Sequence, residues 1–436
     1  MNEQRIRTTQ VPNHIGETVT LRGWVHAIRR VGKLAFLVLR DGWGTVQAVG
    51  KATSVEPLEQ QRAGPETVVS IRGRVVANTA APGGFELVEP CYEVLVPVEE
   101  GLPVALNDKS LAKAKLPTLL DHAPTVWRAP TRRAVLQISA AAMAGFRGTL
   151  HQEGFTEVQT PKIVSGATES GANVFGLDYF GEPAFLAQSP QLYKQMMVGV
   201  FERVFEVGPV FRAEPHATVR HLAEYVSLDV EFGFIEDHLE VARMLRTVLA
   251  GMTSTIEQRC ASALRVLSAS LPEVPEALPT ISFGQARAML AEAGQGPAQA
   301  NDLAPSEERW LGQWAEREHE SAWLVVTGYP MSKRPFYTHP SPSDAGASNS
   351  FDLLFRGTEL VTGGQRLHRY ADLVAAARGA GIALDSIEGY LEAFRYGMPP
   401  HGGFAIGLER FVTQLLGLEN IRLGTLFPRD TNRAAP

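Results

Sequence analysis

Apolar and polar residues alternate in short runs from residue 18 to about residue 97 of the chain. Alternation with a period of two is typical of strands that bury one face. Turns that carry Gly, Asp or Pro separate the runs, which are TVTLRGWVHAIRR, LAFLVLRD, GTVQAVG, ETVVSIRGRVVA and GFELVEPCYEVL. Five short strands at this spacing predict a small closed barrel.

The remainder of the chain mixes helical and strand-like patterns. The segment that follows Pro130 has apolar residues at every third or fourth position, which predicts one long amphipathic helix with Gly154 as its C-cap. Strand-like runs lie at 204–213, 226–235, 323–328, 351–361 and 403–407, and helical patterns at 190–201, 237–263, 283–294, 368–380 and 408–417. Because the strands do not alternate regularly with helices, we expect a mainly antiparallel sheet flanked by helices.

These patterns predict a multi-domain chain. We expect a barrel at 1–98, a hinge rich in Pro, Lys and Asp at 99–130, and an α+β domain at 131–436. No apolar run approaches the roughly 20 residues of a membrane span, the N-terminus has no signal-like region, and only two cysteines occur. We therefore expect a cytoplasmic protein without a membrane segment, a disulfide framework or a structural zinc site.

The distribution of charge narrows the classes of partner. The net charge of -6 argues against bulk attraction to nucleic acid, but residues 1–40 hold seven basic side chains against two acidic ones. Barrels of the OB type bind single-stranded nucleic acid through aromatic stacking and cations. A polyanion partner at the barrel is one interpretation of the basic segment, and an ordinary solvated face is the other.

Two strand-like runs in the second half carry charges on one face. In VFEVGPVFRA, the period of two places Glu206 and Arg212 together, opposite apolar residues. In VSLDVEF it places Ser227, Asp229 and Glu231 together. Charges inside a sheet are costly to bury without partners, so this face predicts the lining of a cleft. The alternative is the solvent-exposed face of an ordinary hairpin.

A second hairpin, SFDLLFRGTELVTGGQR, favours the cleft. Asp352 and Glu359 lie symmetrically about a turn near 355–356, so we expect cross-strand pairing to bring both carboxylates onto one face. Magnesium bound to a polyphosphate would relieve their repulsion, because it needs only one or two protein carboxylates. Thr362 offers a further oxygen ligand. The two glycines before Arg366 allow close backbone approach.

In their order and spacing these segments resemble the class II aminoacyl-tRNA synthetases, in particular the subgroup for aspartate, asparagine and lysine. GFTEVQTPKI resembles motif 1, FRAE followed by RHLAEY resembles motif 2, and GGFAIGLERF resembles motif 3. The resemblance covers nearly the whole chain. It implies an anticodon-binding OB barrel in front of a class II catalytic domain, and a homodimer formed through motif 1.

The resemblance also implies an ATP site. Arg212 would hold the α-phosphate and the amino-acid carboxylate, Glu214 would accept a hydrogen bond from the adenine amino group, and Tyr225 would stack on adenine. Arg220 and His221 would contact the terminal phosphates. Because the amino-acid carboxylate is itself the nucleophile, such a site must position reactants and neutralise charge, and it needs no general base.

The other implied ATP residues come from the second hairpin and from motif 3. Arg410 would close over the nucleotide, and magnesium would be held by Asp352, Glu359 and Thr362, the last at a position where relatives more often have Ser. The implied ATP site is completed by Ala213, Leu222, Gly407, Leu408 and Glu409.

The implied amino-acid pocket contains Glu169, Gln191, Lys194 and Arg366, with Arg212 and Thr362 shared with the ATP site. The two cations Lys194 and Arg366 suit a side-chain carboxylate better than a neutral amide. His216 in the motif 2 loop, the segment RPFY at 334–337 and the ending LFPRDTNR favour L-aspartate, and asparagine stays open as the alternative. Lysine is disfavoured because no acidic residue replaces Arg366.

The resemblance extends to tRNA recognition. The short interval between motif 2 and the second hairpin is typical of the compact archaeal type of aspartate enzyme. Phe36 and Gln47 match the positions that stack on and read the central anticodon uridine, and Arg29 would contact the nearby backbone. His26 stands where strictly tRNA-Asp-selective relatives tend to carry Trp, which indicates aspartylation of both tRNA-Asp and tRNA-Asn. Aspartyl-tRNA-Asn would require a tRNA-dependent amidotransferase as a partner.

Two functions other than aminoacylation of tRNA stay open as alternatives. A synthetase-derived tRNA-binding protein, or a tRNA-independent ligase, would keep the fold without aminoacylation. Loss of the motif arginines or of the magnesium acids would favour these functions, yet Arg212, Glu214, Asp352, Glu359 and Arg410 are all present.

Overall fold

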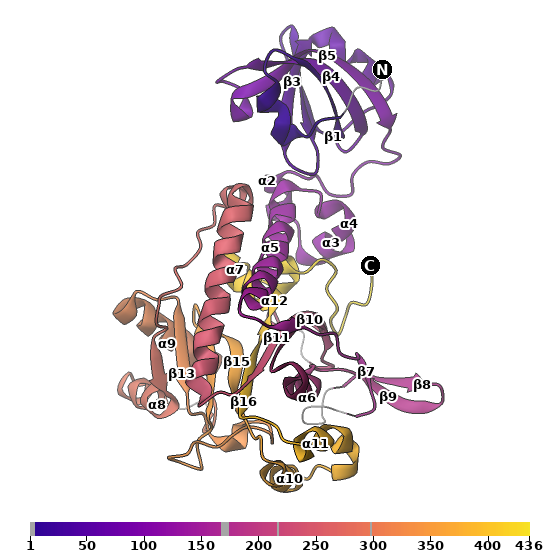
Figure 1. The fold of residues 1–436 in the computed structure, drawn as a ribbon. Coiled ribbons are helices and arrows are strands. Elements are labelled where there is room, and N and C mark those ends of the chain that lie inside the picture. Colours follow the sequence, from indigo (N-terminus) through magenta and orange to yellow (C-terminus); the bar gives the residue numbers. More distant parts are fainter. Residues whose placement is uncertain (1–4, 167–173, 216–217, 297–298) are drawn as a thin grey trace. The chain divides into compact units, whose positions relative to one another are not determined.

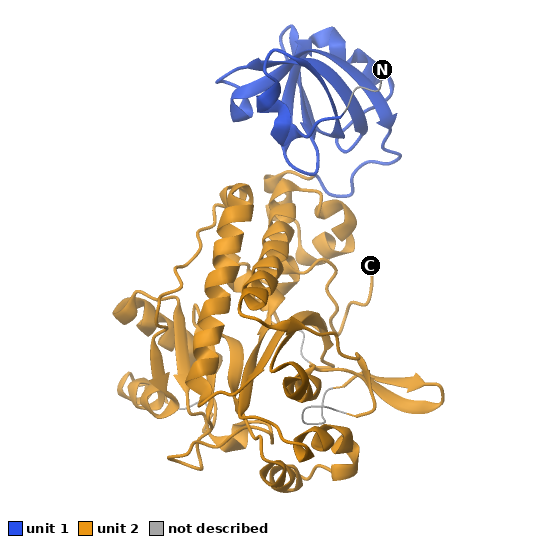
Figure 2. Cartoon of the chain, in the orientation of Figure 1, with its two compact units in different colours: residues 1–105 blue, residues 106–436 orange. Residues whose placement is uncertain are grey.

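The computed structural model describes residues 5–166, 174–215, 218–296 and 299–436, whose elements are labelled in Figure 1. The chain forms two compact units, residues 1–105 and 106–436 (Figure 2). Most of the segment 99–130 differs from the predicted hinge, because it belongs to the second unit and forms three short helices with the buried side chains Leu111, Leu119 and Leu120. These helices are α2 (Asp108–Lys113), α3 (Leu116–Asp121) and α4 (Ala123–Val126).

The first unit is the predicted closed barrel, with strand order β1-β2-β3-β5-β4. Leu37 and Leu39 of β2 and Val46 and Ala48 of β3 are buried in its core, as the alternation in the sequence predicts. The strands are β1 (Thr18–Val31), β2 (Leu34–Arg40), β3 (Thr45–Lys51), β4 (Val68–Ala77) and β5 (Phe85–Val96). The short helices are η1 (Thr8–His14), η2 (Ala52–Val55), α1 (Glu56–Gln60) and η3 (Pro82–Gly84).

The second unit is built on an eight-stranded sheet with the order β12-β13-β14-β15-β16-β11-β10-β6. All neighbouring strands are antiparallel except the pair at each end, β12–β13 and β10–β6, so the predicted mainly antiparallel sheet is confirmed. The strands are β6 (Thr156–Glu157), β10 (Arg203–Phe211), β11 (Glu224–Gly233), β12 (Thr280–Ser282), β13 (Trp323–Thr327), β14 (Ser350–Phe355), β15 (Thr358–Arg366) and β16 (His401–Gly407).

One face of this sheet is apolar and packs against helices. The helices on that face are α5 (Pro130–Gln152), α7 (His238–Leu267) and α12 (Leu408–Leu416), and α5 and α7 run side by side in Figure 1. Phe205, Leu228 and Val230 of the sheet are buried in this core, so the apolar face predicted from VFEVGPVFRA and VSLDVEF is confirmed. The helix predicted after Pro130 is α5, and Gly154 follows its end with φ of 78°.

Smaller layers surround the sheet. Helices α6 (Gln191–Phe201), α10 (Tyr370–Gly379) and α11 (Glu388–Arg395) share one apolar cluster, and α8 (Phe283–Glu292) and α9 (Pro305–His319) share another with β13. A three-stranded sheet contains β7 (Ile163–Val164), β8 (Gly176–Tyr179) and β9 (Glu182–Leu186), and the short helices are η4 (Met331–Lys333), η5 (Leu384–Ile387) and η6 (Ile421–Gly424). Within the described residues, no helix has the length and apolarity to cross a membrane.

The β14–β15 hairpin corrects the expected pairing of Asp352 with Glu359. The turn consists of Arg356 and Gly357, both with positive φ, one position later than expected. A register shift between Leu353 and Leu354 adds a further offset, as a β-bulge does. As a result Asp352 pairs with Thr362, whereas Glu359 pairs with Leu354.

Helix α9 approaches this hairpin closely. A Cβ atom on Gly312 of α9 would lie only 2.5 Å from the backbone nitrogen of Gly357 in the turn. We expect Gly312→Ala to lower the free energy of unfolding by about 1–3 kcal/mol, because a methyl group there overpacks rigid backbone. Urea unfolding of the full chain, followed by circular dichroism, measures this change.

Gly284→Ala is the matched control for this prediction. A Cβ on Gly284, in the neighbouring helix α8, would meet no atom closer than 3.9 Å, and alanine is the better helix former. Equal stabilities of the two variants would contradict the close approach of α9 to the hairpin.

Candidate active site

The polar face of the sheet carries a row of residues in register across five strands. Glu206 pairs with Asp229, Asp229 with Ala405, Ala405 with Thr362, and Thr362 with Asp352. Side chains in such a row point to the same face of the sheet. The row therefore brings together polar side chains that are far apart in the sequence, from Glu206 to Thr362.

The neighbouring row is lined with glycines. Gly403 of β16 pairs with Glu231 of β11 on one side and with Gly364 of β15 on the other. A Cβ on Gly403 would lie 2.7 Å from the Glu231 carboxyl carbon. The glycines therefore leave the space through which Arg366, at the end of β15, reaches the Glu231 carboxylate.

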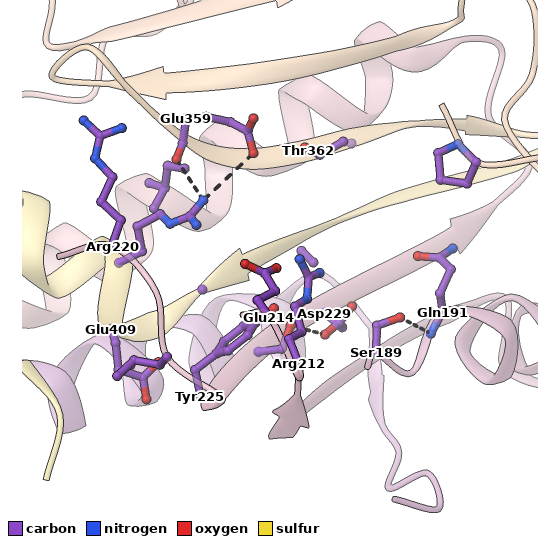
Figure 3. Close-up of a pocket in the computed structure, with 18 of the residues that line it drawn as sticks. Ser189, Gln191, Arg212, Glu214, Arg220, Tyr225, Asp229, Glu359, Thr362 and Glu409 are labelled. Carbon is purple, nitrogen blue, oxygen red and sulfur yellow. Dashed lines mark hydrogen bonds and ion pairs between the residues drawn. The ribbon is translucent and has the colours of Figure 1, made fainter. Parts of the chain in front are cut away.

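A cavity of about 320 Å³ opens over this polar face. Figure 3 shows Glu359 and Thr362 on one side of it and Arg212, Tyr225 and Asp229 on the other. The residues predicted from the sequence that line it are Gln191, Arg212, Glu214, Arg220, His221, Leu222, Tyr225, Ser227, Asp229, Glu359, Thr362, Arg366, Gly407, Glu409 and Arg410. One cavity thus collects residues from α6, the β10–β11 connection, β15, β16 and α12.

One end of the cavity combines an aromatic ring with polar groups. The Arg212 guanidinium lies over the Tyr225 ring, with 5.8 Å between its carbon and the ring centroid. The His221 ring is held between the Thr218 hydroxyl at 2.5 Å and the Glu214 carboxylate at 3.3 Å. This end can hold a flat aromatic ligand beside an anionic group.

The opposite wall of this end is formed by β15 and α12. Arg410 donates to the backbone oxygen of Glu359 at 3.2 Å, and the same nitrogen lies 3.9 Å from the Glu359 carboxylate. Glu409 accepts from the Val226 amide at 3.1 Å, and burial raises the pKa of the Glu409 carboxyl to about 7. Leu408 points away into the apolar core, which explains why it does not line the cavity.

The predicted magnesium ligands are divided between two environments. Glu359 and Thr362 line the cavity and offer oxygen ligands, which magnesium prefers. Asp352 does not line it, because its carboxylate is buried and lies 3.0 Å from the Arg334 guanidinium. Burial and the charge of Glu359 raise the pKa of the Asp352 carboxyl, although Arg334 opposes the shift.

The donor set of Glu359 and Thr362 fits an ion that a substrate also holds. Across the described parts of the chain, no group of three or more His, Cys, Asp or Glu side chains is arranged to bind a metal. A magnesium ion that takes phosphate oxygens needs no such group.

The part of the cavity that the sequence assigns to the amino acid differs from the doubly cationic pocket expected there. The buried Lys194 ammonium lies 3.0 Å from Asp229 and 3.3 Å from Glu231, and it does not line the cavity. Arg366, which does line it, bonds the other oxygen of Glu231 at 3.0 Å. A buried ammonium needs such partners, so Asp229 and Glu231 hold Lys194 behind the wall. Although burial raises the pKa of Glu231, Arg366 and Lys194 lower it below the usual value.

Other polar groups complete this end of the cavity. The buried side-chain nitrogen of Gln191 has no hydrogen-bond partner within the described residues, so it is a donor available to a ligand. The sequence did not assign Ser189, Arg334 or Thr338 to the wall, although Ser189 lies two residues before Gln191 and the segment RPFY begins at Arg334. Glu169, which the sequence assigned to the amino-acid site, and His216, the motif 2 loop residue that favoured aspartate, lie outside the described residues.

A buried histidine, His401, lies beside Arg366 on the neighbouring strand. His401 pairs with Arg366 across β15 and β16. Its ring nitrogens lie 2.9 Å from the Pro399 carbonyl oxygen and 3.1 Å from the Gln195 side-chain oxygen. Burial lowers the pKa of the His401 imidazole to about 4.

In the first unit, the predicted anticodon residues share the outer face of the barrel. Arg29 of β1 pairs with Phe36 of β2, and both point away from the core that Leu37 and Leu39 fill. Gln47 of β3 lies on the same face and donates to the Glu86 carboxylate at 2.9 Å. His26 lies at the register shift between β1 residues 25 and 27.

The chain combines a closed five-stranded barrel with a second unit whose mainly antiparallel sheet carries the polar cavity. Residues 117–431 match the tRNA synthetases class II (D, K and N), and residues 19–95 match the OB-fold nucleic acid binding domain. The chain belongs to the class II tRNA synthetases of this D, K and N group.

Individual relatives are similar over their full length. An aspartate–tRNA(Asp/Asn) ligase from Deinococcus radiodurans is 45% identical, over 99% of this chain and 99% of that protein. The ligase of the same name from Thermus thermophilus is 45% identical, over 99% of this chain and all of that protein. The solved asparaginyl-tRNA synthetase from Pyrococcus horikoshii, complexed with asparaginyl-adenylate, is 32% identical with a TM-score of 0.92, covering 99% of this chain and 100% of its own.

The pKa of His401 predicts how stability depends on pH. Between its unfolded value of 6.5 and its folded value of about 4, the unfolded chain binds a proton that the folded chain excludes. This contribution to the free energy of unfolding is complete above pH 6.5, and about 3 kcal/mol of it is lost as the pH falls to 4. We expect His401→Gln to flatten the profile in this window.

Urea unfolding of the wild type and of His401→Gln between pH 4.5 and 7 measures the two slopes. Parallel profiles would contradict a neutral His401 in the folded chain, whatever the offset between them.

Proposed function

We propose that this chain uses ATP to activate L-aspartate and transfers the aspartyl group to tRNA-Asp and to tRNA-Asn. The observation that carries the choice of amino acid is Arg366, which lines the cavity in an orientation held by Glu231 and the Gly403 carbonyl oxygen. A fixed guanidinium favours a carboxylate as its partner. The names of the two relatives at 45% identity support the same substrates.

The proposed reaction requires the site to position aspartate and ATP and to neutralise the phosphate charge. The aspartate α-carboxylate attacks the α-phosphorus of ATP, forms aspartyl adenylate and releases pyrophosphate, so no general base is needed. Arg212 is assigned to the α-phosphate and the attacking carboxylate, and Tyr225 and Glu214 to adenine. Arg220 and Arg410 are assigned to the remaining phosphate charge. The terminal adenosine of the tRNA then attacks the adenylate carbonyl carbon.

Glu359 and Thr362 are the residues that would hold magnesium, which neutralises phosphate charge when it is bound with ATP. Asp352 serves a different purpose in this proposal. By pairing with Arg334 it fixes a second guanidinium at the cavity wall.

Asparagine is the alternative amino acid, and one observation favours it. The charges of Lys194 and Arg366 are matched by those of Asp229 and Glu231, so this group of four is formally neutral. A neutral pocket suits an amide as well as a carboxylate. Pyrophosphate exchange with each amino acid separates the two proposals.

The barrel supports the second half of the reaction. Phe36, Arg29 and Gln47 form an aromatic and polar patch suited to unpaired bases of an anticodon. We assign acceptance of tRNA-Asn to His26. The proposal includes a homodimer formed through the motif 1 segment, a tRNA-dependent amidotransferase that acts on aspartyl-tRNA-Asn, and a cytoplasmic location.

Arg366→Lys tests the choice of amino acid. Lysine keeps the charge beside Glu231 but loses the planar fork, so we expect the KM for aspartate to rise about 30-fold, equivalent to about 2 kcal/mol. The KM for ATP stays unchanged. ATP–pyrophosphate exchange with aspartate and with asparagine gives both constants.

The control for Arg366→Lys is Arg395→Lys, which changes an arginine that pairs with Glu388 on α11 and does not line the cavity. Exchange that asparagine stimulates more than aspartate, in the wild-type chain, would overturn the proposed substrate.

Aspartylation of purified transcripts tests the tRNA partners. We expect the wild type to charge both tRNA-Asp and tRNA-Asn. His26→Trp should reduce charging of tRNA-Asn about tenfold or more relative to tRNA-Asp, because the larger ring narrows the space for the third anticodon base. Absence of product above background on tRNA-Asn with the wild type would contradict the relaxed reading.

A further inference from the structure

Helix α9 places a buried carboxylate behind the cavity wall, next to residues assigned to phosphate and magnesium. Glu308 lies on this helix, which belongs to none of the three motif segments, and it is only 7% exposed. Its Oε2 atom accepts a hydrogen bond from the backbone nitrogen of Glu359 at 3.1 Å. The Arg220 guanidinium lies 4.0 Å from the same oxygen. Glu308 therefore contacts two residues that line the cavity.

The contact with Glu359 occurs at the irregular part of β15. The register shift in the hairpin places Glu359 opposite Leu354 and leaves Leu360 as the extra residue. A bulge disrupts the regular ladder of hydrogen bonds, and a side-chain carboxylate can satisfy an amide there. The Glu308 carboxylate thus stabilises the backbone conformation that directs the Glu359 side chain.

Glu359 is held at both ends of its backbone. Glu308 accepts from its nitrogen at 3.1 Å, and Arg410 donates to its oxygen at 3.2 Å. The close approach of Gly312 to Gly357 fixes α9 against the same hairpin. The position of the Glu359 carboxylate is therefore coupled to α9 by a hydrogen bond and by backbone packing.

The adjacent residue, Glu307, provides a comparison on the same helix. Glu307 is 1% exposed, pairs with Arg287 of α8 at 2.6 Å and accepts from the Ala304 amide at the start of α9. Neither Arg287 nor Ala304 lines the cavity. Glu308 is buried to a similar degree, but its partners are the groups assigned to phosphate and magnesium.

We propose that Glu308 is a positioning residue for magnesium-bound ATP. It fixes the backbone of Glu359 and supplies a counter-charge that orients Arg220. This inference rests on the proposed function only for the identity of the nucleotide. It extends the nucleotide site to an element between motif 2 and motif 3.

Three variants of the full chain test the proposal. Glu308→Ala removes the acceptor and the charge, Glu308→Gln keeps an oxygen that can accept from the Glu359 amide, and Glu307→Gln is the matched control on the same helix. Isothermal titration calorimetry with ATP, in magnesium chloride and in excess EDTA, gives a readout that does not depend on activity. Pyrophosphate exchange supplies the KM values for ATP and for aspartate.

We expect Glu308→Ala to weaken ATP binding in magnesium about tenfold or more, as loss of a group that orients a metal ligand does. The difference from wild type should shrink in EDTA. In the pyrophosphate exchange assay, we expect Glu308→Ala to raise the KM for ATP and to leave the KM for aspartate constant. Glu308→Gln should lose less ATP affinity than Glu308→Ala. Glu307→Gln should bind ATP as the wild type does.

Two results would overturn the proposal. One is ATP affinity in Glu308→Ala that equals that of Glu307→Gln, and the other is a rise in the aspartate KM as large as that of the ATP KM. If circular dichroism shows that Glu308→Ala is unfolded, Glu308→Gln decides, and wild-type ATP affinity and magnesium dependence in that variant would overturn it. The two proposals can fail separately. If the wild type shows no aspartate-dependent exchange but Glu308→Ala still weakens ATP binding in magnesium, the proposed substrate is rejected and this inference is supported.

Discussion

The Glu231 carboxylate is the group on which the arrangement of the candidate site depends. It is fully buried between the Arg366 guanidinium at 3.0 Å and the Lys194 ammonium at 3.3 Å. An unpaired buried charge costs several kcal/mol, so each of these charges is tolerated because of the others. Helix α6 and strands β11 and β15 are thereby held at one point, and the orientation of Arg366 in the cavity wall follows from it.

The two faces of the sheet have different roles: the apolar face stabilises the fold, and the polar face carries the candidate site. The apolar face packs on α5 and α7 and needs no precise partner for each side chain. On the polar face every charge requires a specific partner, and the pairs Lys194 with Asp229 and Arg334 with Asp352 meet this need. The polar groups available to a ligand are those that remain directed at the cavity after these pairs have formed.

The sequence predicted the parts of the fold that follow from local patterns. Alternation predicted the barrel and the charged face of β10 and β11. The spacing of apolar residues after Pro130 predicted the bounds of α5 to within a few residues. The sequence did not predict α9, because the polar residues of that helix mask a weak apolar period around Leu311 and Ala315. It also treated 99–130 as a hinge, since short helices stabilised by contacts distant in sequence have little local signal.

The sequence alone determined two things through its residue types and motif order. These are the side chains available for phosphate, magnesium and an amino acid, and the family to which the chain belongs. The tertiary structure decided how each charge is used. A turn placed one residue later and a bulge in β15 offset Asp352 from Glu359 along the hairpin and left it beside Arg334. Burial placed Lys194 behind the cavity wall, and α9 placed Glu308 beside Glu359. Each outcome depends on pairing and desolvation between segments far apart in the chain, which no local pattern encodes.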